Sequence, residues 1–454
     1  MSSRNKIIIA LIILMFALRA YDIRDPFSTN GVDEGIHLLQ AHMMHDGYNY
    51  YDDLQGDQAP LALLTFSVLD GNVLACRWIS YALFFISSIF LFLIAQKFGK
   101  DVAFTALLIL CLDFTLLRES RLASLDMFSA TLLCIASFFI LTYMEKHTMA
   151  SLALSSLFLS LSVLTKVIPV FLLLFLLFYL LFMRKDYRHA LLAMGVMCIP
   201  AAFLLLAFTP HQLIEGIILR QSHRGFDMYS KLSIAVFIAS CFIYLYTIRK
   251  WNWRDARIRY LLIWALLIFI PLMVQGRTLP HHFTFLSYPL AVLSAIAIHR
   301  GWNVKRKTVL SAFIAINLSA ASVFIATAPE DISYDAAHDV AALTDAGDMV
   351  ISGNPLVTVL SHRTAPPNLT NVAEYHYPET TLQDVVYWLE RNETKVVVLY
   401  YHLAEIDGLK EYLENSSLWH FYEKIEGRGQ MTFHGISLQF SRDTYEIYVK
   451  EGAQ

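Results

Sequence analysis

The stretch WISYALFFISSIFLFLIA, residues 78–95, runs for eighteen residues without a single Asp, Glu, Lys or Arg. A helix needs about 20 predominantly apolar residues to cross the hydrocarbon core of a bilayer. The stretch therefore predicts a membrane-spanning helix, and similar stretches recur along the chain.

The whole chain has the composition of a polytopic membrane protein. Of its 454 residues, 56% are hydrophobic and 16% are charged, with a mean hydropathy of +0.50, whereas charged residues make up roughly a quarter of a soluble protein. We predict about eleven transmembrane helices. The predicted spans are residues 7–18, 78–95, 102–117, 127–144, 147–165, 167–183, 189–210, 232–248, 260–276, 283–298 and 308–328.

Two of these segments are open to a second interpretation. Residues 7–18 follow Arg4 and Lys6 like the apolar core of a signal peptide, but no A-x-A cleavage site comes after them, so we expect a retained span. Residues 102–117 are short and contain Asp113. A carboxyl at membrane depth is costly, so we expect Asp113 to face the interior of the bundle.

The charges of the loops predict the orientation. Loops 184–188, 249–259 and 299–307 together hold twelve Lys and Arg, whereas the opposite loops hold most of the acids, including eight Asp and Glu from Asp22 to Asp57. Short loops rich in Lys and Arg stay in the cytoplasm. We therefore expect a multi-pass protein of the plasma membrane, with a cytoplasmic N-terminus and the C-terminus outside.

The chain divides into two predicted parts. Residues 1–328 form a membrane domain with one long outer loop at 22–75, and residues 329–454 form a polar α/β domain outside the membrane. In the second part, three short apolar runs predict strands, a periodic run predicts a helix, and a proline-containing run predicts a loop. The predicted strands are DMVIS (348–352), KVVVLYY (395–401) and YEIYV (445–449). The predicted helix is TLQDVVYWLERN (381–392), and the predicted loop is HRTAPPNLT (362–370).

Asp33 and Glu34 stand side by side in GVDEGIH, residues 31–37, just after the first span. Adjacent carboxylates repel each other unless both are solvated or a cation, a proton or a hydroxyl lies between them. A structural interpretation is an amphipathic helix whose first turn carries the acids, where the helix dipole favours anions. The alternative is a catalytic pair, and other residues on the same face bear on that choice.

Cations gather at the same predicted face. In RESRLASLD (118–126), Arg118 and Arg121 are three residues apart and share a helical face, which suits an anion such as phosphate. A single cation near a span end commonly extends to the interface, whereas acids and cations on one face suit transfer from a lipid-linked phosphate. Further charged or polar residues predicted at this face are Asp126, Lys166 in LTKVIP (164–169), and Arg277, His281 and His282 in GRTLPHH (276–282).

The order of these motifs resembles that of the GT-C class of membrane glycosyltransferases, in particular the superfamily of dolichyl-phosphate-mannose protein mannosyltransferases and aminoarabinose transferases. The resemblance covers roughly residues 1–300. It rests on the D-E pair at 33–34, DQAPL (57–61), R-x-x-R-x-x-x-x-D (118–126), L-T-K (164–166) and L-P-H-H-F-x-x-x-x-Y-P-L (279–290).

The resemblance implies an inverting transfer of a sugar from a polyprenyl- or dolichyl-phosphate donor to an acceptor hydroxyl at the outer membrane face. Asp33 matches the family's general base, and Glu34 matches its neighbour, which helps to position the acceptor or a metal. A divalent cation stays an open cofactor. Cations matched or assigned to the donor phosphate are Arg118, Arg121, Lys166, Arg277, His281 and His282.

One departure bears on the sugar. Aminoarabinose transferases read Glu-Lys-Pro-Pro before the second span, whereas this chain reads Asp57-Gln58-Ala59-Pro60. The lysine that would meet the donor phosphate is absent, so we expect mannose or another hexose in place of aminoarabinose. Asp57, Gln58 and Asp126 remain further candidate site residues, and a metal-binding role for Asp57 stays open.

Two other functions agree less well with the sequence. A transporter or lipid flippase typically shows repeated halves and ionisable residues near the midplane, and the chain shows no repeat. An oligosaccharyltransferase of the same class carries a W-W-D signature that is absent here. The acceptor can be a protein, a glycan or a lipid. Membrane lipids are expected partners, and nucleic acid is not.

Overall fold

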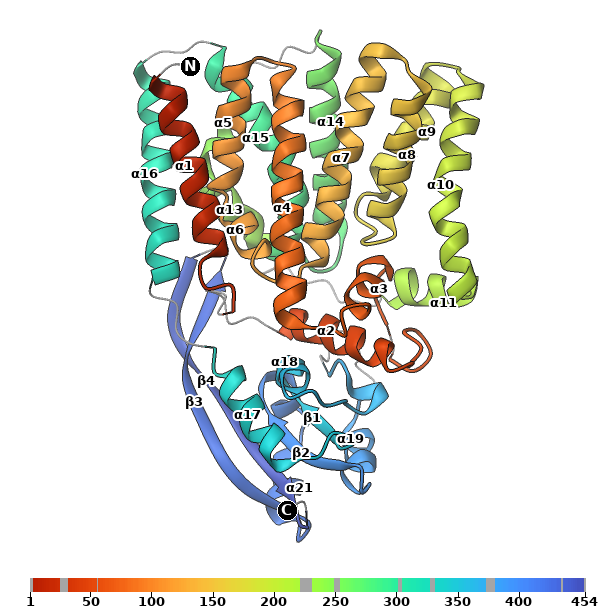
Figure 1. Cartoon of the computed structure of the whole chain (residues 1–454), viewed down its shortest axis with the longest axis vertical. Helices are drawn as coiled ribbons and strands as arrows, with labels where there is room; N and C mark the ends of the chain where they lie inside the picture. The colour runs from red at the N-terminus through yellow and green to blue at the C-terminus, as the bar shows by residue number, and fades with distance from the viewer. Residues whose placement is uncertain are drawn as a thin grey trace.

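The structure is a computed structural model that describes residues 3–24, 32–54, 56–220, 231–248, 254–300, 304–326, 331–372, 380–433 and 436–452. It consists of a helix bundle and a smaller domain built around a sheet, which lies against one end of the bundle (Figure 1). The other notable feature is a layer of short helices between them, formed mainly by α2, α3 and α11 (Figure 1).

The bundle and the intervening layer contain most of the helices. Their bounds are α1 (Ser3–Ala20), α2 (Val32–His45), α3 (Leu61–Ser67), α4 (Val73–Gln96), α5 (Lys100–Cys111), α6 (Phe114–Glu119), α7 (Leu125–Lys146), α8 (Met149–Val163), α9 (Val170–Phe178), η1 (Tyr179–Met183), α10 (Tyr187–Ala207), α11 (Pro210–Ile214), η2 (Glu215–Leu219), α13 (Leu232–Ser240), η4 (Phe242–Ile248), α14 (Ala256–Val274), η5 (Pro280–Phe283), α15 (Thr284–His299) and α16 (Val304–Ala326).

The helices have the composition of a multi-pass membrane protein, and each predicted span overlaps at least one of them. Among the described residues, five helices are long and apolar enough to cross a bilayer: α4, α7, α10, α14 and the run Pro280–His299. Two shorter apolar helices, Met149–Val163 and Val170–Met183, lie beside them in sequence. The count of eleven crossings stays a prediction, because several of the remaining helices are short or interrupted.

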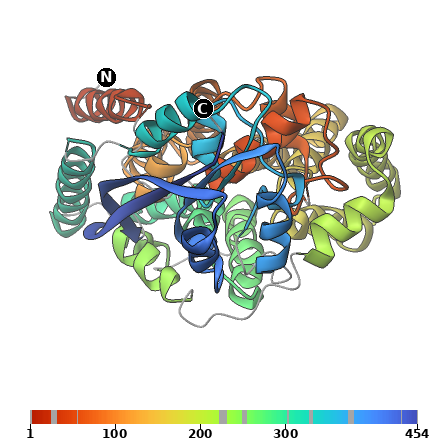
Figure 2. The same cartoon turned by 90° about the horizontal axis from the view of Figure 1, so that it is seen from below.

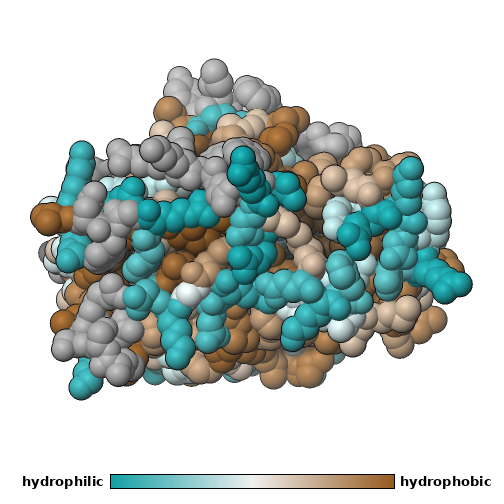
Figure 3. Space-filling model, turned by 90° about the horizontal axis from the view of Figure 1, so that it is seen from above, coloured by the Kyte–Doolittle hydropathy of each residue, from teal (hydrophilic) through white to brown (hydrophobic). Residues whose placement is uncertain are grey.

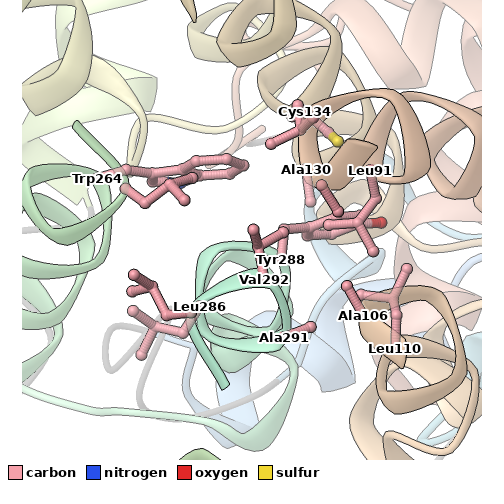
Figure 4. Packing of buried hydrophobic residues seen from close by; sticks show 14 of the residues in the cluster. Leu91, Ala106, Leu110, Ala130, Cys134, Trp264, Leu286, Tyr288, Ala291 and Val292 are labelled. Carbon is pink, nitrogen blue, oxygen red and sulfur yellow. The ribbon is translucent and has the colours of Figure 1, made fainter. Parts of the chain in front are cut away.

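The centre of the bundle is α15. Side chains from α4, α5, α7 and α14 surround it, as Leu91, Ala106, Cys134 and Trp264 show in Figure 4. The hydroxyl of Tyr288 donates to Ser87 Oγ at 2.9 Å, so the polar end of this buried ring is satisfied within the core. The core therefore fixes the N-terminal part of α15, which directly follows His281 and His282 of η5.

Asp113 faces the interior, as the sequence predicts. Its side chain is fully buried and accepts hydrogen bonds from the N–H groups of Thr115 and Leu116, so it caps the N-terminus of α6. The hydroxyl of Tyr244 donates to its second oxygen at 2.5 Å. This carboxyl therefore stabilises the turn between α5 and α6.

Hydrophilic side chains spread over the end of the bundle away from the sheet domain (Figure 3). The helix α10 begins at this end with Arg184, Lys185 and Arg188 close to its first turn. Of the predicted cytoplasmic loops, residues 249–253 and 301–303 lie outside the described residues. The inside-outside orientation remains a prediction from the charges.

The sheet domain confirms the three predicted strands and the predicted helix. Its sheet has the order β1-β2-β4-β3, with β1 and β2 parallel and β4 antiparallel to both neighbours. The long strand β3 was not predicted, although it pairs with β4 along most of its length (Figure 2). The bounds are α17 (Ser333–Leu343), β1 (Met349–Ser352), α18 (Pro355–Leu360), η6 (Pro367–Leu369), α19 (Leu382–Leu389), β2 (Thr394–Leu399), α20 (Tyr401–Ala404), α21 (Leu409–Asn415), β3 (Trp419–Phe433) and β4 (Ile436–Lys450).

The sheet domain contacts the helical part of the protein where its helix α18 packs against α2. Gly35 of α2 lies so close to α18 that a Cβ atom there would stand 2.4 Å from the backbone nitrogen of Leu356. Below the bundle, the hydroxyl of Thr370 donates to the carbonyl of Leu54 at 3.2 Å. Only glycine permits this approach of the two backbones, so the contact fixes the sheet domain beside the first turn of α2.

Candidate active site

The acid pair lies in the first turn of α2, where its two carboxylates have different surroundings. Asp33 keeps 34% of its side chain exposed, whereas Glu34 is buried. A helix starting at Val32 with both acids in its first turn agrees with the structural interpretation of the pair. It leaves room for a second role for Asp33, whose carboxylate remains accessible.

Glu34 is held by the guanidinium of Arg77 on α4. Arg77 donates Nε to Oε1 at 2.9 Å and Nη2 to Oε2 at 2.7 Å, and the N–H of Ala123 donates to Oε1 at 2.7 Å. Both charged side chains are almost completely buried. This paired arrangement makes Glu34 a residue that positions α2, and with it Asp33, against the bundle.

A cavity of about 60 Å³ lies between α2, α6, α7 and the loop before α15. It brings together residues that are far apart in the sequence, from the first outer loop to the region of η5. The sequence-predicted residues that line it are Asp33, Glu34, Asp57, Gln58, Arg118, Asp126, Lys166, His281 and His282.

Within the cavity, acids and cations alternate. Lys166 Nζ lies 2.6 Å from Asp126 Oδ2, and Arg118 forms an ion pair with Glu119. The ring of His281 lies between two carboxylates, with Nδ1 3.9 Å from Asp33 and Nε2 3.9 Å from Asp126. These His281 distances are too long for direct hydrogen bonds.

Asp126 has one oxygen available toward this space. Its side chain is buried, and within the described part of the chain its Oδ1 atom has no hydrogen-bond partner. A buried carboxylate oxygen without a partner is costly, so this atom is suited to accept a hydrogen bond from a bound molecule.

Arg121 lies elsewhere, and the prediction that it shares a helical face with Arg118 is wrong. The helix α6 ends at Glu119, so the spacing of three residues does not continue along one helix. The buried guanidinium of Arg121 instead caps the end of α1. It donates to the carbonyls of Leu18 and Arg19 at 3.0 Å each, of Tyr21 at 2.6 Å and of Asp22 at 2.9 Å.

Arg277 lines a neighbouring groove of about 680 Å³, here called the outer groove. The outer groove shares Asp57, Gln58, Lys166 and His282 with the polar cavity and continues along apolar side chains of α9, η2 and α14. His282 accepts hydrogen bonds from Gln275 Nε2 at 3.0 Å and from the N–H of Leu279 at 3.2 Å. The polar cavity therefore opens onto an apolar groove that passes between helices.

The sheet domain supplies two residues that the sequence did not suggest. Asn371 lines the polar cavity from the loop after η6. Burial raises the pKa of the Tyr401 phenol; the carboxylates of Glu405 and Asp33 act in the same direction, and Arg277 opposes them. Tyr401 has a φ of 43°, an uncommon backbone conformation for a bulky residue. Tyr401 lies within electrostatic range of Asp33 but does not line the polar cavity.

Other lining residues that sequence reasoning missed are Glu119 and His37. Glu119 lies within the quoted motif 118–126, and His37 ends the quoted GVDEGIH, so their proximity to the selected residues was the available signal. No group of three or more His, Cys, Asp and Glu suited to a metal ion occurs in the described part of the chain.

Known proteins share this arrangement of bundle and sheet domain. The crystal structure of ArnT from Cupriavidus metallidurans in the apo state is 13% identical, with 98% of each chain covered and a TM-score of 0.67. The same ArnT bound to undecaprenyl phosphate gives a TM-score of 0.65 at 13% identity and the same coverage. The chain has the GT-C glycosyltransferase fold.

The GT-C fold also relates the chain to an oligosaccharyltransferase. AglB from Archaeoglobus fulgidus, in complex with an inhibitory peptide and a dolichol-phosphate, is 12% identical, with a TM-score of 0.54 over 93% of this chain and 74% of that one. The family described as dolichyl-phosphate-mannose-protein mannosyltransferase matches residues 60–214. A comparison with curated protein sequences gives no match.

Proposed function

We propose that the protein is a membrane glycosyltransferase that moves a sugar, mannose or another hexose, from a polyprenyl-phosphate donor to an acceptor hydroxyl, with inversion. The observation that carries this proposal is the junction of the polar cavity with the outer groove. A phosphate at the junction would meet Lys166, while an attached polyprenyl chain would follow the apolar walls. The similar ArnT structure, which contains undecaprenyl phosphate, supports the same assignment.

Asp33 is proposed as the general base. Its carboxylate is partly exposed and lines the cavity, so it is accessible to an acceptor hydroxyl. Proton transfer to a positioned carboxylate typically contributes about 10²–10⁴-fold to the rate. An inverting displacement takes place in one step, and it therefore needs no second carboxylate as a nucleophile.

The departing phosphate is proposed to lie near Lys166, Arg118 and Arg277. Fixed cations in a site that excludes water stabilise the charge that develops on a leaving group. Lys166 is already paired with Asp126, so the phosphate would share this cation with a carboxylate. Asp126 Oδ1 is proposed to accept a hydrogen bond from a hydroxyl of the donor sugar.

The proposed orientation places this site at the outer membrane face and the sheet domain outside the cell, in the plasma membrane. The basic loops of the opposite bundle end support it. In this orientation, the acceptor approaches from outside, next to Asn371 and Tyr401.

The proposed function is tested by measuring transfer of radiolabelled sugar from polyprenyl-phosphate mannose and polyprenyl-phosphate glucose in membranes that contain the full chain. Asp33→Asn is expected to lower the turnover by about 10²–10⁴-fold, because the amide cannot accept the proton of the acceptor. Asp46→Asn, one residue beyond the C-terminal end of α2, is the matched control and is expected to keep wild-type turnover. Full activity of a well-expressed Asp33→Asn variant would refute the assignment of the base.

A further inference from the structure

A second cavity continues from the outer groove along α9 and α14. This inner cavity has a volume of about 330 Å³ and is lined by α9, η1, α14 and α7. Its walls include Phe175 from α9, Tyr179 from η1, Ile263 and Arg259 from α14, and Met144 from α7.

The outer groove and the inner cavity occupy one stripe on each helix. Phe171 lines the outer groove, and Phe175 and Tyr179 follow it at intervals of four residues. On α14, Ile270 and Leu267 line the outer groove, and Ile263 follows after four residues. Residues three or four apart lie on the same helical face, so the two spaces belong to a single seam between α9 and α14.

The seam is deeper than one leaflet of a bilayer. From Val274 in the outer groove to Ala256 in the inner cavity, α14 rises by about 27 Å at 1.5 Å per residue. The hydrocarbon core is about 30 Å thick, so a phospholipid anchored in the outer leaflet reaches about half of this depth. A single molecule that fills the seam from the polar cavity therefore needs a longer chain.

The walls of the inner cavity suit a hydrocarbon. Leu172, Leu176 and Tyr143 line it with buried side chains. The hydroxyl of Tyr260 donates to Ser137 Oγ at 2.8 Å, so this polar group is satisfied and its ring contributes apolar surface. Arg259 is exposed at the far end of the seam.

We propose that the inner cavity binds the distal isoprenoid units of the donor lipid, so that the protein distinguishes long polyprenyl phosphates from short ones. This inference rests on the proposed function, because it takes the occupant of the outer groove to be a polyprenyl phosphate. It adds a separate site for the end of the chain, remote from the reacting atoms.

The test compares binding of undecaprenyl phosphate and farnesyl phosphate to the purified full-length protein by native mass spectrometry. Ile263→Trp is expected to fill the inner cavity. It should weaken the binding of undecaprenyl phosphate on the order of tenfold, because several CH₂ groups of the lipid lose their buried contacts. Farnesyl phosphate, which is too short to reach the cavity, is expected to bind this variant as it binds wild type.

Two further variants separate a specific effect from a general one. Met144→Phe narrows the cavity from α7 and is expected to act in the same direction as Ile263→Trp. Leu266→Trp adds the same bulk to an exposed position of α14 that lines neither cavity, and is expected to change neither affinity.

The outcomes are distinguishable. Unchanged undecaprenyl phosphate binding in Ile263→Trp and Met144→Phe would overturn the inference and leave the proposed function intact. Loss of a co-purified phospholipid from these variants, with undecaprenyl phosphate unaffected, would assign the cavity to a lipid of the opposite leaflet and would also overturn it. Failure of wild type to bind either polyprenyl phosphate would overturn both proposals.

Discussion

Replacing Arg77 by methionine is expected to lower the free energy of unfolding by about 3–5 kcal/mol, because removing one member of a buried ion pair strands the other. The burial and geometry of the Arg77–Glu34 pair support a loss of this size. The Arg77 side chain is 0% exposed and that of Glu34 is 2% exposed, and two N–H donors contact the two carboxylate oxygens. In the variant, the buried carboxylate would keep the Ala123 N–H as a partner.

The chain contains a matched control for this prediction. Lys410 and Glu446 in the sheet domain form an ion pair with the same N–O distance of 2.7 Å as Arg77 and Glu34, but their side chains are 50% and 21% exposed. An exposed pair contributes at most about 1 kcal/mol. Lys410→Met is therefore expected to change the stability several-fold less than Arg77→Met.

A third variant separates lost pairing from lost packing. Replacing a whole buried ion pair by apolar residues is often nearly neutral, since no charge is left unpaired. The double variant Glu34→Leu with Arg77→Met is thus expected to regain most of the stability that the single variant loses. It is not expected to regain turnover, because α2 would lose the contact that orients Asp33.

The assay is denaturation of the purified protein in mixed detergent micelles, titrated with SDS and followed by tryptophan fluorescence. Equal losses in Arg77→Met and Lys410→Met would refute the reasoning, because burial would then make no difference. A double variant no more stable than Arg77→Met would refute it as well, since the stranded charge would not be the cause.

Two further predictions concern positions away from the polar cavity. Arg121→Met is expected to destabilise the protein by about 3 kcal/mol, because four carbonyls at the end of α1 lose a charged hydrogen-bond donor. A raised KM for the lipid-linked sugar in the folded fraction would show instead that Arg121 contacts the phosphate. Gly35→Ala is expected to destabilise by about 1–3 kcal/mol through overpacking against Leu356, whereas Gly195→Ala, with open space around it in a helix, is expected to stabilise by about 0.5–1 kcal/mol. Thermal unfolding of both glycine variants measures the sign of each change in stability, and equal changes would contradict the close contact at Gly35.

The sequence predicted the elements whose signal is local. Charge-free stretches long enough for a bilayer became helices, and Asp113 was placed in the interior because a lipid-facing carboxyl is too costly. The three predicted strands were short apolar runs that are buried in the sheet. The strand β3 was missed because WHFYEKIEGRGQMTF lacks such a run and owes its conformation to pairing with β4.

The candidate site depends on contacts that no local pattern contains. Arg118 and Arg121 have helical spacing, yet the helix ends between them, so their guanidinium groups point to different partners. Arg77 stands just before a predicted span, where a lone cation normally extends to the interface. Its pairing with Glu34 joins residues that are 43 positions apart in the sequence.

The contact of α18 with Gly35 also has a consequence for biosynthesis. The first turn of α2 is synthesised first, whereas Leu356 and Asn371, which contact it or line the same cavity, follow more than 300 residues later in the chain. A nascent chain that has already inserted its bundle would therefore hold an incomplete pocket. The pocket would be completed only when the sheet domain folds against α2.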